Sequence, residues 1–324
     1  MSNCLYCYKP LPEGGQHDFH EHCSKDFFGE KTLPVLPYTL DKMTELAKHV
    51  VERSIAVPGV QPKISLTLVE DTINGQKRDR LTIVGALGGN YIVKPPNAEY
   101  PEMPQNEHLT MRIAEAFGIR TVESSLVRLQ SGELSYITRR IDRTENQEKI
   151  HMLDMFQITE ATDKYKSSME RIGKALHSYA ANTLLDQLRL FEMTVFAFLT
   201  GNNDMHLKNF SMITNEKGDW VLAPAYDLLN VSIVLPADKE ELALTLNGKK
   251  SKLNRTDFEH LAKSLGLNDR QVRGVFTRFV DLWTLAIKWI NDSFLSNELK
   301  EAYRSMLVER YSRLKLAYPF IAGR

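Results

Sequence analysis

The first half of the chain alternates between short runs with strand and helix periodicity. Residues 64–69 alternate apolar and polar side chains, which predicts a half-buried strand, and Asn74-Gly75 is typical of a hairpin turn. Apolar residues at three- and four-residue spacing predict a helix over Asp41–Arg53. The other predicted elements here are strands at Leu81–Val84, Tyr91–Lys94, Val122–Leu129 and Leu134–Ile141, and a helix at Asn106–Phe117. This half is therefore predicted to be mixed α/β, with a small, mostly antiparallel sheet.

After about residue 150 the pattern becomes mainly helical. Leu184–Thr200 is long and apolar throughout, which predicts a buried helix that ends directly before Asp204. Phe210–Ile213 and Trp220–Ala223 predict a hairpin, and residues 255–318 predict several amphipathic helices.

Composition narrows the class of protein. The chain has 324 residues, of which 43% are hydrophobic and 25% charged, as in a soluble globular protein. Its formal net charge is zero, which does not favour direct nucleic-acid binding or attachment to a membrane surface. No apolar run approaches the ~20 residues of a membrane helix, and no basic region followed by an apolar core marks a signal peptide. We therefore expect a cytoplasmic protein.

All three cysteines lie within the first 23 residues. An odd number in such a chain argues against a disulfide framework. Cys4, Cys7, His20 and Cys23 supply three thiolates and one imidazole, which suits a structural zinc ion, with His17 and His22 as spare candidates. Few Lys or Arg residues surround this zinc knuckle, so its expected role is docking rather than reading DNA. The alternative is three free thiols in a flexible tail.

The segment after the long apolar helix carries candidate chemistry for phosphoryl transfer. It contains Asp204, then Asn209 five residues later, then Asp227 eighteen residues beyond the Asn. One Asp can orient and deprotonate a hydroxyl group, while an Asn and a second Asp can hold Mg²⁺ on ATP phosphates. His206 and Lys208 could stabilise phosphate charge. The alternative is a polar loop in which Asp and Asn serve as turn residues.

Two segments of the first half could bind the phosphates themselves. Ser54–Lys63 is a Gly-containing loop leading into a strand, and its backbone N–H groups could face phosphate oxygens. Lys94 ends a predicted strand and could neutralise phosphate charge, with Glu107 on the next helix as its ion partner. Alternatively, Ser54–Lys63 is an ordinary turn, and the side chains of Lys94 and Glu107 are solvated.

Together these segments resemble the HipA family of bacterial serine/threonine kinases, the toxin halves of toxin–antitoxin pairs. The matching motifs, in order over roughly residues 50–320, are Pro58–Lys63, Tyr91–Lys94, Arg139–Arg143, Asp204–Phe210, Tyr226-Asp227, Leu242–Lys250 and Leu265–Leu267.

The resemblance implies an α+β, bilobal protein-kinase-like fold, distantly similar to phosphoinositide kinases. We expect a zinc knuckle and linker over residues 1–35, a mixed α/β N-lobe over 36–145 and a helical C-lobe over 146–324. Carried over by position, Asp204 is the base, Asn209 and Asp227 hold Mg²⁺, and Lys94 contacts the phosphates. The remaining nucleotide-binding positions implied are Pro58, Gly59, Val60, Gln61, Pro62 and Lys63 over the phosphates, Arg139, Arg140 and Ile141 as the adenine hinge, and Tyr226. The family commonly has an acidic residue at position 139, so only backbone contacts carry over there.

The resemblance further implies a Mg-ATP-dependent serine/threonine protein kinase that phosphorylates a serine near its own Gly loop. The family position falls on Ala56, so Ser54 is the expected site. Family precedent suggests aminoacyl-tRNA synthetases as substrates. Because only about 50 residues precede the Gly loop, the resemblance implies a short form of the family that lacks the usual N-terminal subdomain. We expect a separately encoded partner that resembles this subdomain, a helix-turn-helix antitoxin, or both. A small-molecule or lipid phosphotransferase, or a non-enzymatic regulatory scaffold with a kinase-like fold, are the alternatives.

Overall fold

The chain divides into two compact units in a computed structural model. The structure describes residues 3–12, 17–53, 63–73, 76–84, 88–96 and 98–317, and side chains at 47–53 and 71–78 are not described. The N-terminal unit comprises 1–108, 122–149 and 292–294, and the C-terminal unit comprises 109–121, 150–291 and 295–324.

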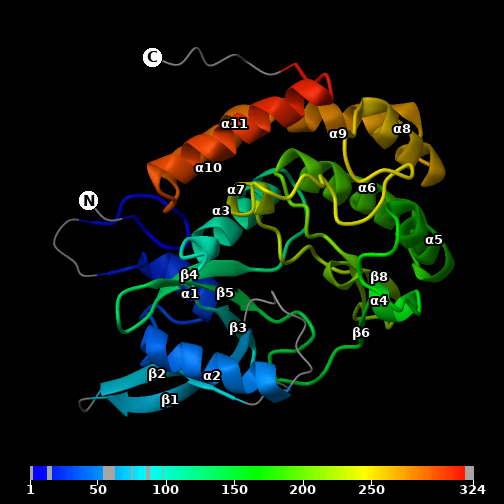
Figure 1. The fold of residues 1–324 in the computed structure, drawn as a ribbon. Coiled ribbons are helices and arrows are strands. Elements are labelled where there is room, and N and C mark those ends of the chain that lie inside the picture. Colours follow the sequence, from blue (N-terminus) through cyan, green and yellow to red (C-terminus); the bar gives the residue numbers. More distant parts are fainter. Residues whose placement is uncertain are drawn as a thin grey trace. The chain divides into compact units, whose positions relative to one another are not determined.

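A five-stranded antiparallel sheet forms the centre of the N-terminal unit (Figure 1). Its strand order is β2-β1-β3-β5-β4. The strands are β1 (Ile64–Ile73), β2 (Gln76–Ile83), β3 (Tyr91–Lys94), β4 (Ser124–Arg128) and β5 (Leu134–Arg139). The helices are α1 (Glu21–Phe28), α2 (Leu40–Arg53) and α3 (Met103–Ala116), whose residues from 109 onward count with the other unit.

One face of this sheet is buried because apolar side chains of neighbouring strands point to the same side. Leu66, Val93 and Ile137 lie on three neighbouring strands and are fully buried, which is the pattern expected of a sheet with one face in a core. The antiparallel sheet is therefore confirmed, and β3 has the predicted bounds. Strand β1 runs to Ile73, four residues further than predicted, and the predicted Asn74-Gly75 turn lies outside the described residues.

The C-terminal unit combines helices with a small antiparallel sheet of order β6-β7-β8. The strands are β6 (Met152–Asp154), β7 (Ser211–Thr214) and β8 (Trp220–Leu222). Its described helices are α4 (Met155–Ile158), α5 (Met169–Tyr179), α6 (Thr183–Leu199), the 3₁₀ turn η1 (Leu207–Asn209), α7 (Val231–Val234), α8 (Arg255–Ser264), α9 (Asp269–Asp281), α10 (Trp283–Asp292) and α11 (Asn297–Arg313). The predicted hairpin and the series of late helices are both present.

Helix α6 is the core of this unit. Twelve of its residues are buried, because α5, α8 and α11 all contact it. Phe196 lies 5.8 Å from Phe117 between ring centroids, and Phe198 lies 5.1 Å from Phe258. A helix covered on several sides is apolar around its circumference, which is why the sequence pattern identified it. The helix ends at Leu199, and Gly201, whose positive φ of 66° favours glycine, leads the chain into the Asp204 loop, residues 202–209.

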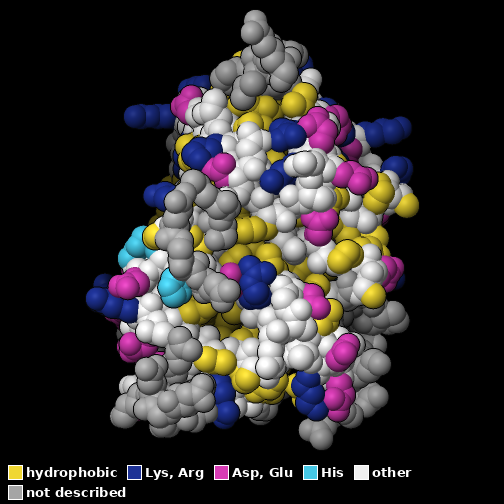
Figure 2. Space-filling model, turned by 90° about the vertical axis from the view of Figure 1, so that its left-hand side faces the viewer, with side chains coloured by type: hydrophobic (Ala, Val, Ile, Leu, Met, Phe, Trp, Pro, Cys, Tyr) yellow, Lys and Arg dark blue, Asp and Glu magenta, His cyan; other side chains and the backbone are white. Residues whose placement is uncertain are grey.

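The surface carries charge of both signs. The sequence has 41 basic and 41 acidic residues, and Figure 2 shows them interspersed over the face that it displays. Within the described ranges, every helix is too short or too polar to cross a membrane.

Candidate functional site

The Asp204 loop is held by its own side chains. The Asp204 N–H donates to Oδ1 of Asn202 at 3.3 Å, and Nδ2 of Asn209 donates to the Asp204 carbonyl at 3.0 Å. The second bond fixes the Asn209 amide so that its Oδ1, an oxygen suited to a hard cation, points away from the Asp204 carbonyl. Asn209 is 7% exposed, whereas Asp204 is only partly buried.

The Asp204 carboxylate has a partner that the sequence did not reveal. The Tyr165 hydroxyl donates to Oδ1 of Asp204 at 2.8 Å. Burial and the nearby Asp204 charge raise the pKa of Tyr165 well above its ordinary range, so the phenol remains a donor at any physiological pH. Tyr165 therefore fixes one oxygen of the carboxylate that we assigned as the base.

His206 lies in the same loop as a buried, neutral ring. Burial lowers its pKa below 6.5, while the carboxylates of Asp204 and Asp227 act in the opposite direction. Its Nδ1 has no hydrogen-bond partner among the described residues. A neutral His206 can offer a hydrogen bond to a ligand but no positive charge.

Asp227 follows β8 in a turn with a positive φ of 56°. The turn is fixed from two directions: its backbone carbonyl accepts from Nδ2 of Asn202 at 3.4 Å, and the Ala225 N–H donates to the Arg120 carbonyl at 2.7 Å. Asn202 thus links the two loops that carry Asp204 and Asp227. Asp204, His206 and Asn209 lie on the first of these loops and Asp227 on the second.

Tyr226 forms hydrogen bonds with the segments around it, and the Lys208 ammonium lies near an aromatic ring. The Tyr226 hydroxyl lies 2.5 Å from Oγ of Ser211 and donates to the Lys208 carbonyl at 3.0 Å. Nζ of Lys208 lies 5.0 Å from the centroid of the Phe156 ring, and the residue is exposed. Tyr226 therefore joins the Asp204 loop to the Asp227 turn.

The N-terminal unit contains a buried ion pair on its central strand. Nζ of Lys94, the last residue of β3, lies 2.5 Å from Oε1 of Glu107 on α3. Lys94 is 3% exposed and Glu107 is fully buried. The ammonium also lies 5.2 Å from the ring centroid of Tyr136, its cross-strand neighbour on β5. The predicted partnership of Lys94 and Glu107 is present, and burial excludes the alternative of two solvated side chains.

The segment predicted to be the adenine hinge begins at the end of β5. Nε of Arg139 donates to the Phe27 carbonyl at 2.9 Å, so this side chain contacts the N-terminal segment. Arg140 makes a bidentate pair with Asp142, at 2.8 and 2.7 Å. Ile141 is half-buried. Residues 58–62 and Ser54 lie outside the described residues, while Lys63 is exposed just before β1.

Four potential metal ligands converge in the same unit. The ligand atoms of Cys4, Cys7, His20 and Cys23, here called the Cys/His cluster, all lie within 4.8 Å of one another. Nδ1 of His20 is 3.5 Å from Sγ of Cys7 and 3.7 Å from Sγ of Cys23. A tetrahedral zinc site places sulfur and nitrogen ligands about 3.6 Å apart. His20 also donates from Nε2 to the Pro10 carbonyl at 3.0 Å, which leaves Nδ1 unprotonated and aimed at the thiols.

The thiol chemistry of the cluster also fits a cation. A hydrogen bond from Cys7 lowers the pKa of the Cys4 thiol, whereas burial raises that of Cys23. Three thiols this close cannot all ionise unless a positive charge offsets their repulsion. Of the spare candidates, Nε2 of His22 lies 3.3 Å from Sγ of Cys23, and His17 is exposed outside the cluster.

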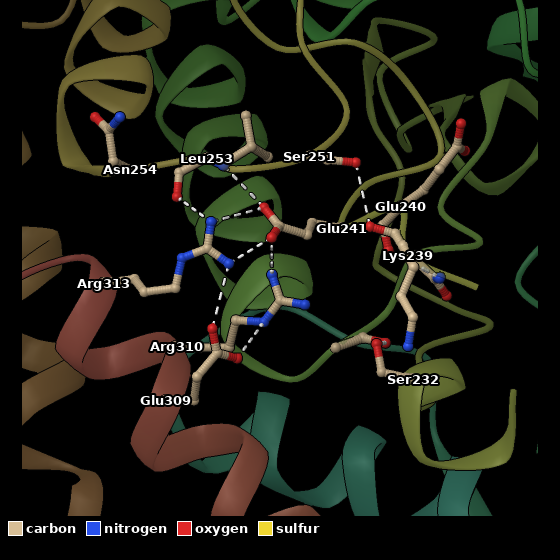
Figure 3. Close-up of polar contacts among 12 residues, drawn as sticks. Ser232, Lys239, Glu240, Glu241, Ser251, Leu253, Asn254, Glu309, Arg310 and Arg313 are labelled. Carbon is tan, nitrogen blue, oxygen red and sulfur yellow. Dashed lines mark hydrogen bonds and ion pairs between the residues drawn. The ribbon is translucent and has the colours of Figure 1, made fainter. Parts of the chain in front are cut away.

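Residues 238–241 contact both the Asp204 loop and helix α11. Nδ2 of Asn203 donates to Oδ2 of Asp238 at 3.0 Å and to the Glu240 carbonyl at 3.1 Å. The next residue, Glu241, pairs with Arg310 and Arg313 of α11 (Figure 3). Sequence reasoning missed this network, because a single Glu in the polar run 238–241 has no distinguishing pattern.

The comparisons with known proteins agree with this architecture. A model of the HipA-like C-terminal domain matches residues 55–285. A putative kinase of Haemophilus influenzae is 30% identical over 266 residues, covering 72% of this chain and 74% of that protein. The putative kinase Y4dM of Sinorhizobium fredii is 32% identical over 248 residues, covering 70% of this chain and 59% of that protein.

Among solved structures, HipA of Shewanella oneidensis MR-1, from its complex with HipB and operator DNA, superimposes with a TM-score of 0.65. The match covers 83% of this chain and 71% of that chain at 21% identity, which shows a shared fold. The chain therefore belongs to the HipA-like C-terminal domain family.

Proposed function

We propose that this protein is a Mg-ATP-dependent kinase that transfers the γ-phosphate of ATP to a serine or threonine hydroxyl of a protein. The observation that supports the proposal is the hydrogen bond from Asn202 to the Asp227 carbonyl, which links the loop carrying Asp204 and Asn209 to the turn carrying Asp227. The names of the relatives, both called putative kinases, support the same reaction class.

The chain's own groups have distinct roles in this reaction. Asp204 accepts the proton of the acceptor hydroxyl as its oxygen bonds to the γ-phosphorus and the bond from that phosphorus to the bridging oxygen breaks, releasing ADP. Asn209 and Asp227 offer oxygens to Mg²⁺, which supplies charge neutralisation when bound. His206 is neutral and offers a hydrogen bond. Lys208 contributes positive charge near the loop.

The N-terminal unit supplies the groups for nucleotide binding. Lys94, oriented by Glu107, contacts the phosphates, as the strand lysine and helix glutamate of kinases do. The backbone of Arg139–Ile141 contacts adenine, since both arginine side chains have partners within the unit. Lys63 and the loop before it cover the phosphates, and Tyr226 acts by holding the Asp227 turn.

Three finer proposals accompany this one. Ser54 is the proposed autophosphorylation site, where a phosphate would repel those of ATP. The Cys/His cluster is proposed to hold a structural zinc ion, on the basis of its tetrahedral spacing. A separately encoded antitoxin is the proposed partner, because the S. oneidensis relative was solved with HipB. An aminoacyl-tRNA synthetase is the proposed substrate on the family resemblance alone, and the cytoplasm is the proposed location on the apolar pattern of the sequence.

Mass spectrometry after incubation with Mg-ATP tests the central proposal. We expect wild-type protein to gain about 80 daltons, the mass of one phosphate, and peptide mapping to place it on Ser54. Asp204→Ala should gain nothing. Phosphate on another residue would move the autophosphorylation site. Absence of any gain in wild type, together with phosphate transfer to a metabolite or lipid, would overturn the protein-kinase proposal.

A further inference from the structure

The Cys/His cluster is physically continuous with the nucleotide-binding part of its unit. Two of its ligands belong to α1: His20 is the N-cap residue and Cys23 lies in the first turn. At the other end of the same helix, Phe27 and Phe28 pack against Tyr91 of β3, with ring centroids 5.9 and 5.8 Å apart. Tyr91 is three residues before Lys94 on that strand.

Helix α1 also holds the proposed hinge. The Phe27 carbonyl accepts from Nε of Arg139 at 2.9 Å and from the Tyr91 hydroxyl at 3.5 Å. Arg139 and Tyr91 are directly paired across β3 and β5. One carbonyl at the end of α1 therefore fixes side chains on both strands that carry the proposed ATP contacts.

The turn that carries Cys4 and Cys7 reaches the helix of the ion pair. The Tyr8 hydroxyl forms a 2.9 Å hydrogen bond with Nδ1 of His108, the neighbour of Glu107 on α3. Tyr8 is 2% exposed and has a positive φ of 62°, a conformation fixed by its N–H bond to the Cys4 carbonyl. The same turn joins the sheet, because the Leu126 N–H of β4 donates to the Leu5 carbonyl at 3.4 Å.

These contacts depend on segments that cannot fold alone. Helix α1 has eight residues, well below the length at which an isolated helix is stable in water. A metal ion that joins the Cys4–Cys7 turn to the start of α1 would supply the missing stability, because a metal that binds only the folded ligand set contributes folding free energy.

We propose that zinc bound at the Cys/His cluster supports the ATP-binding surface of the N-terminal unit, so that zinc occupancy determines affinity for Mg-ATP. The inference rests on the proposed kinase function. Loss of zinc releases α1 from Tyr91 and Arg139 and releases Tyr8 from His108, which frees both the hinge and the helix that positions Glu107.

The experiment measures zinc content and nucleotide affinity separately on the full chain. Zinc is measured by release to a colorimetric chelator, and Mg-ATP binding by titration calorimetry before chelation, after chelation and after zinc is restored. We expect one zinc per chain, an affinity that falls about tenfold or more on chelation, and recovery with zinc. Cys23→Ser should lack zinc and not recover.

Tyr8→Phe keeps all four proposed zinc ligands and removes only the hydrogen bond to His108. It therefore distinguishes loss of support for the ATP-binding surface from unfolding of the zinc site. It should retain one zinc and bind Mg-ATP about 2–10-fold more weakly, the range expected for one lost buried hydrogen bond. Tyr179→Phe, at a residue 61% exposed in the other unit, is the matched control and should leave the affinity unchanged.

The outcomes distinguish this inference from the kinase proposal. A protein without zinc, or one whose Mg-ATP affinity is equal with and without zinc, would overturn the coupling while leaving the kinase proposal intact. Zinc-loaded wild type that binds no Mg-ATP would overturn the kinase proposal, and this inference with it.

Discussion

The Tyr165 hydroxyl donates a 2.8 Å hydrogen bond to Oδ1 of Asp204, the carboxylate proposed as the base. One oxygen is thereby held in place and the other is left for the acceptor hydroxyl. We predict that Tyr165→Phe lowers kcat for phosphate transfer about 3–10-fold, because the carboxylate loses orientation worth one hydrogen bond. KM for ATP should be unchanged. Steady-state kinetics beside Tyr179→Phe measures both, and an unaltered kcat would contradict a positioning role.

Replacing the two aspartates should separate chemistry from metal binding. Asp204→Asn should reduce phosphate transfer about 10²–10⁴-fold while Mg-ATP still binds, because only the proton acceptor is lost. Asp227→Asn should weaken Mg-ATP binding itself, because it loses a ligand charge. Calorimetric titration with Mg-ATP and with metal-free ATP makes the comparison. Asp219→Asn, on the exposed β7–β8 turn, is the control. If Asp204→Asn and Asp227→Asn change the affinity for Mg-ATP equally, the roles assigned to the two aspartates are wrong.

Replacing one member of the buried pair Lys94–Glu107 should lower the free energy of unfolding more than replacing both. Glu107→Gln leaves an ammonium buried without its carboxylate, which we expect to cost about 3–5 kcal/mol in the free energy of unfolding. Lys94→Met/Glu107→Leu removes both charges and should cost less. Denaturant titration measures each variant. Lys42→Met, from the exposed pair Lys42–Glu45, should cost at most about 1 kcal/mol. A double variant less stable than Glu107→Gln would contradict this account.

Parts of the fold and site were readable from sequence because they are local. The apolar run of α6 and the Tyr-Ile-Val-Lys strand are continuous segments of sequence, and Asp204 and Asn209 are only five residues apart. Tyr165 lies 39 residues before Asp204, so no local pattern could pair them. Likewise α1 was not predicted, since its stability depends on contacts with distant strands rather than on its own eight residues.

Burial of His206 should appear in the pH dependence of stability. Its pKa in the folded protein lies below the ordinary 6.5, chiefly because burial disfavours the charged ring. The unfolded chain therefore binds the proton more readily, so the contribution of His206 to stability is complete above pH 6.5 and is lost as pH falls through the folded pKa. Thermal melts between about pH 8 and 5 should show a shallower loss for His206→Gln than for wild type. His260→Gln, at an exposed residue of α8, should follow the wild-type curve, and parallel curves for all three proteins would contradict the assignment.

Glu241 should be essential to the C-terminal unit, because its carboxylate accepts three hydrogen bonds from two segments and forms an ion pair with Arg310. Besides the pairs with Arg310 and Arg313, its Oε2 accepts from the Leu253 N–H at 2.9 Å (Figure 3). Glu241 is 7% exposed, and burial lowers the pKa of Arg310 even though Glu241 opposes the shift, so the two charges depend on each other.

Glu241→Gln should therefore lower the free energy of unfolding by about 3–5 kcal/mol, the cost of removing the buried carboxylate that faces the buried guanidinium of Arg310. Because Glu240 and Asp238 hold Asn203 beside Asp204, the variant should also lower kcat more than it raises KM for ATP at temperatures where it remains folded.

Glu309→Gln is the control. Its carboxylate pairs with the same arginines but is 53% exposed, so the free energy of unfolding should change by at most about 1 kcal/mol. Denaturant titration and steady-state kinetics on the two variants provide the comparison. If Glu241→Gln proves as stable and as active as Glu309→Gln, the network does not support the Asp204 loop.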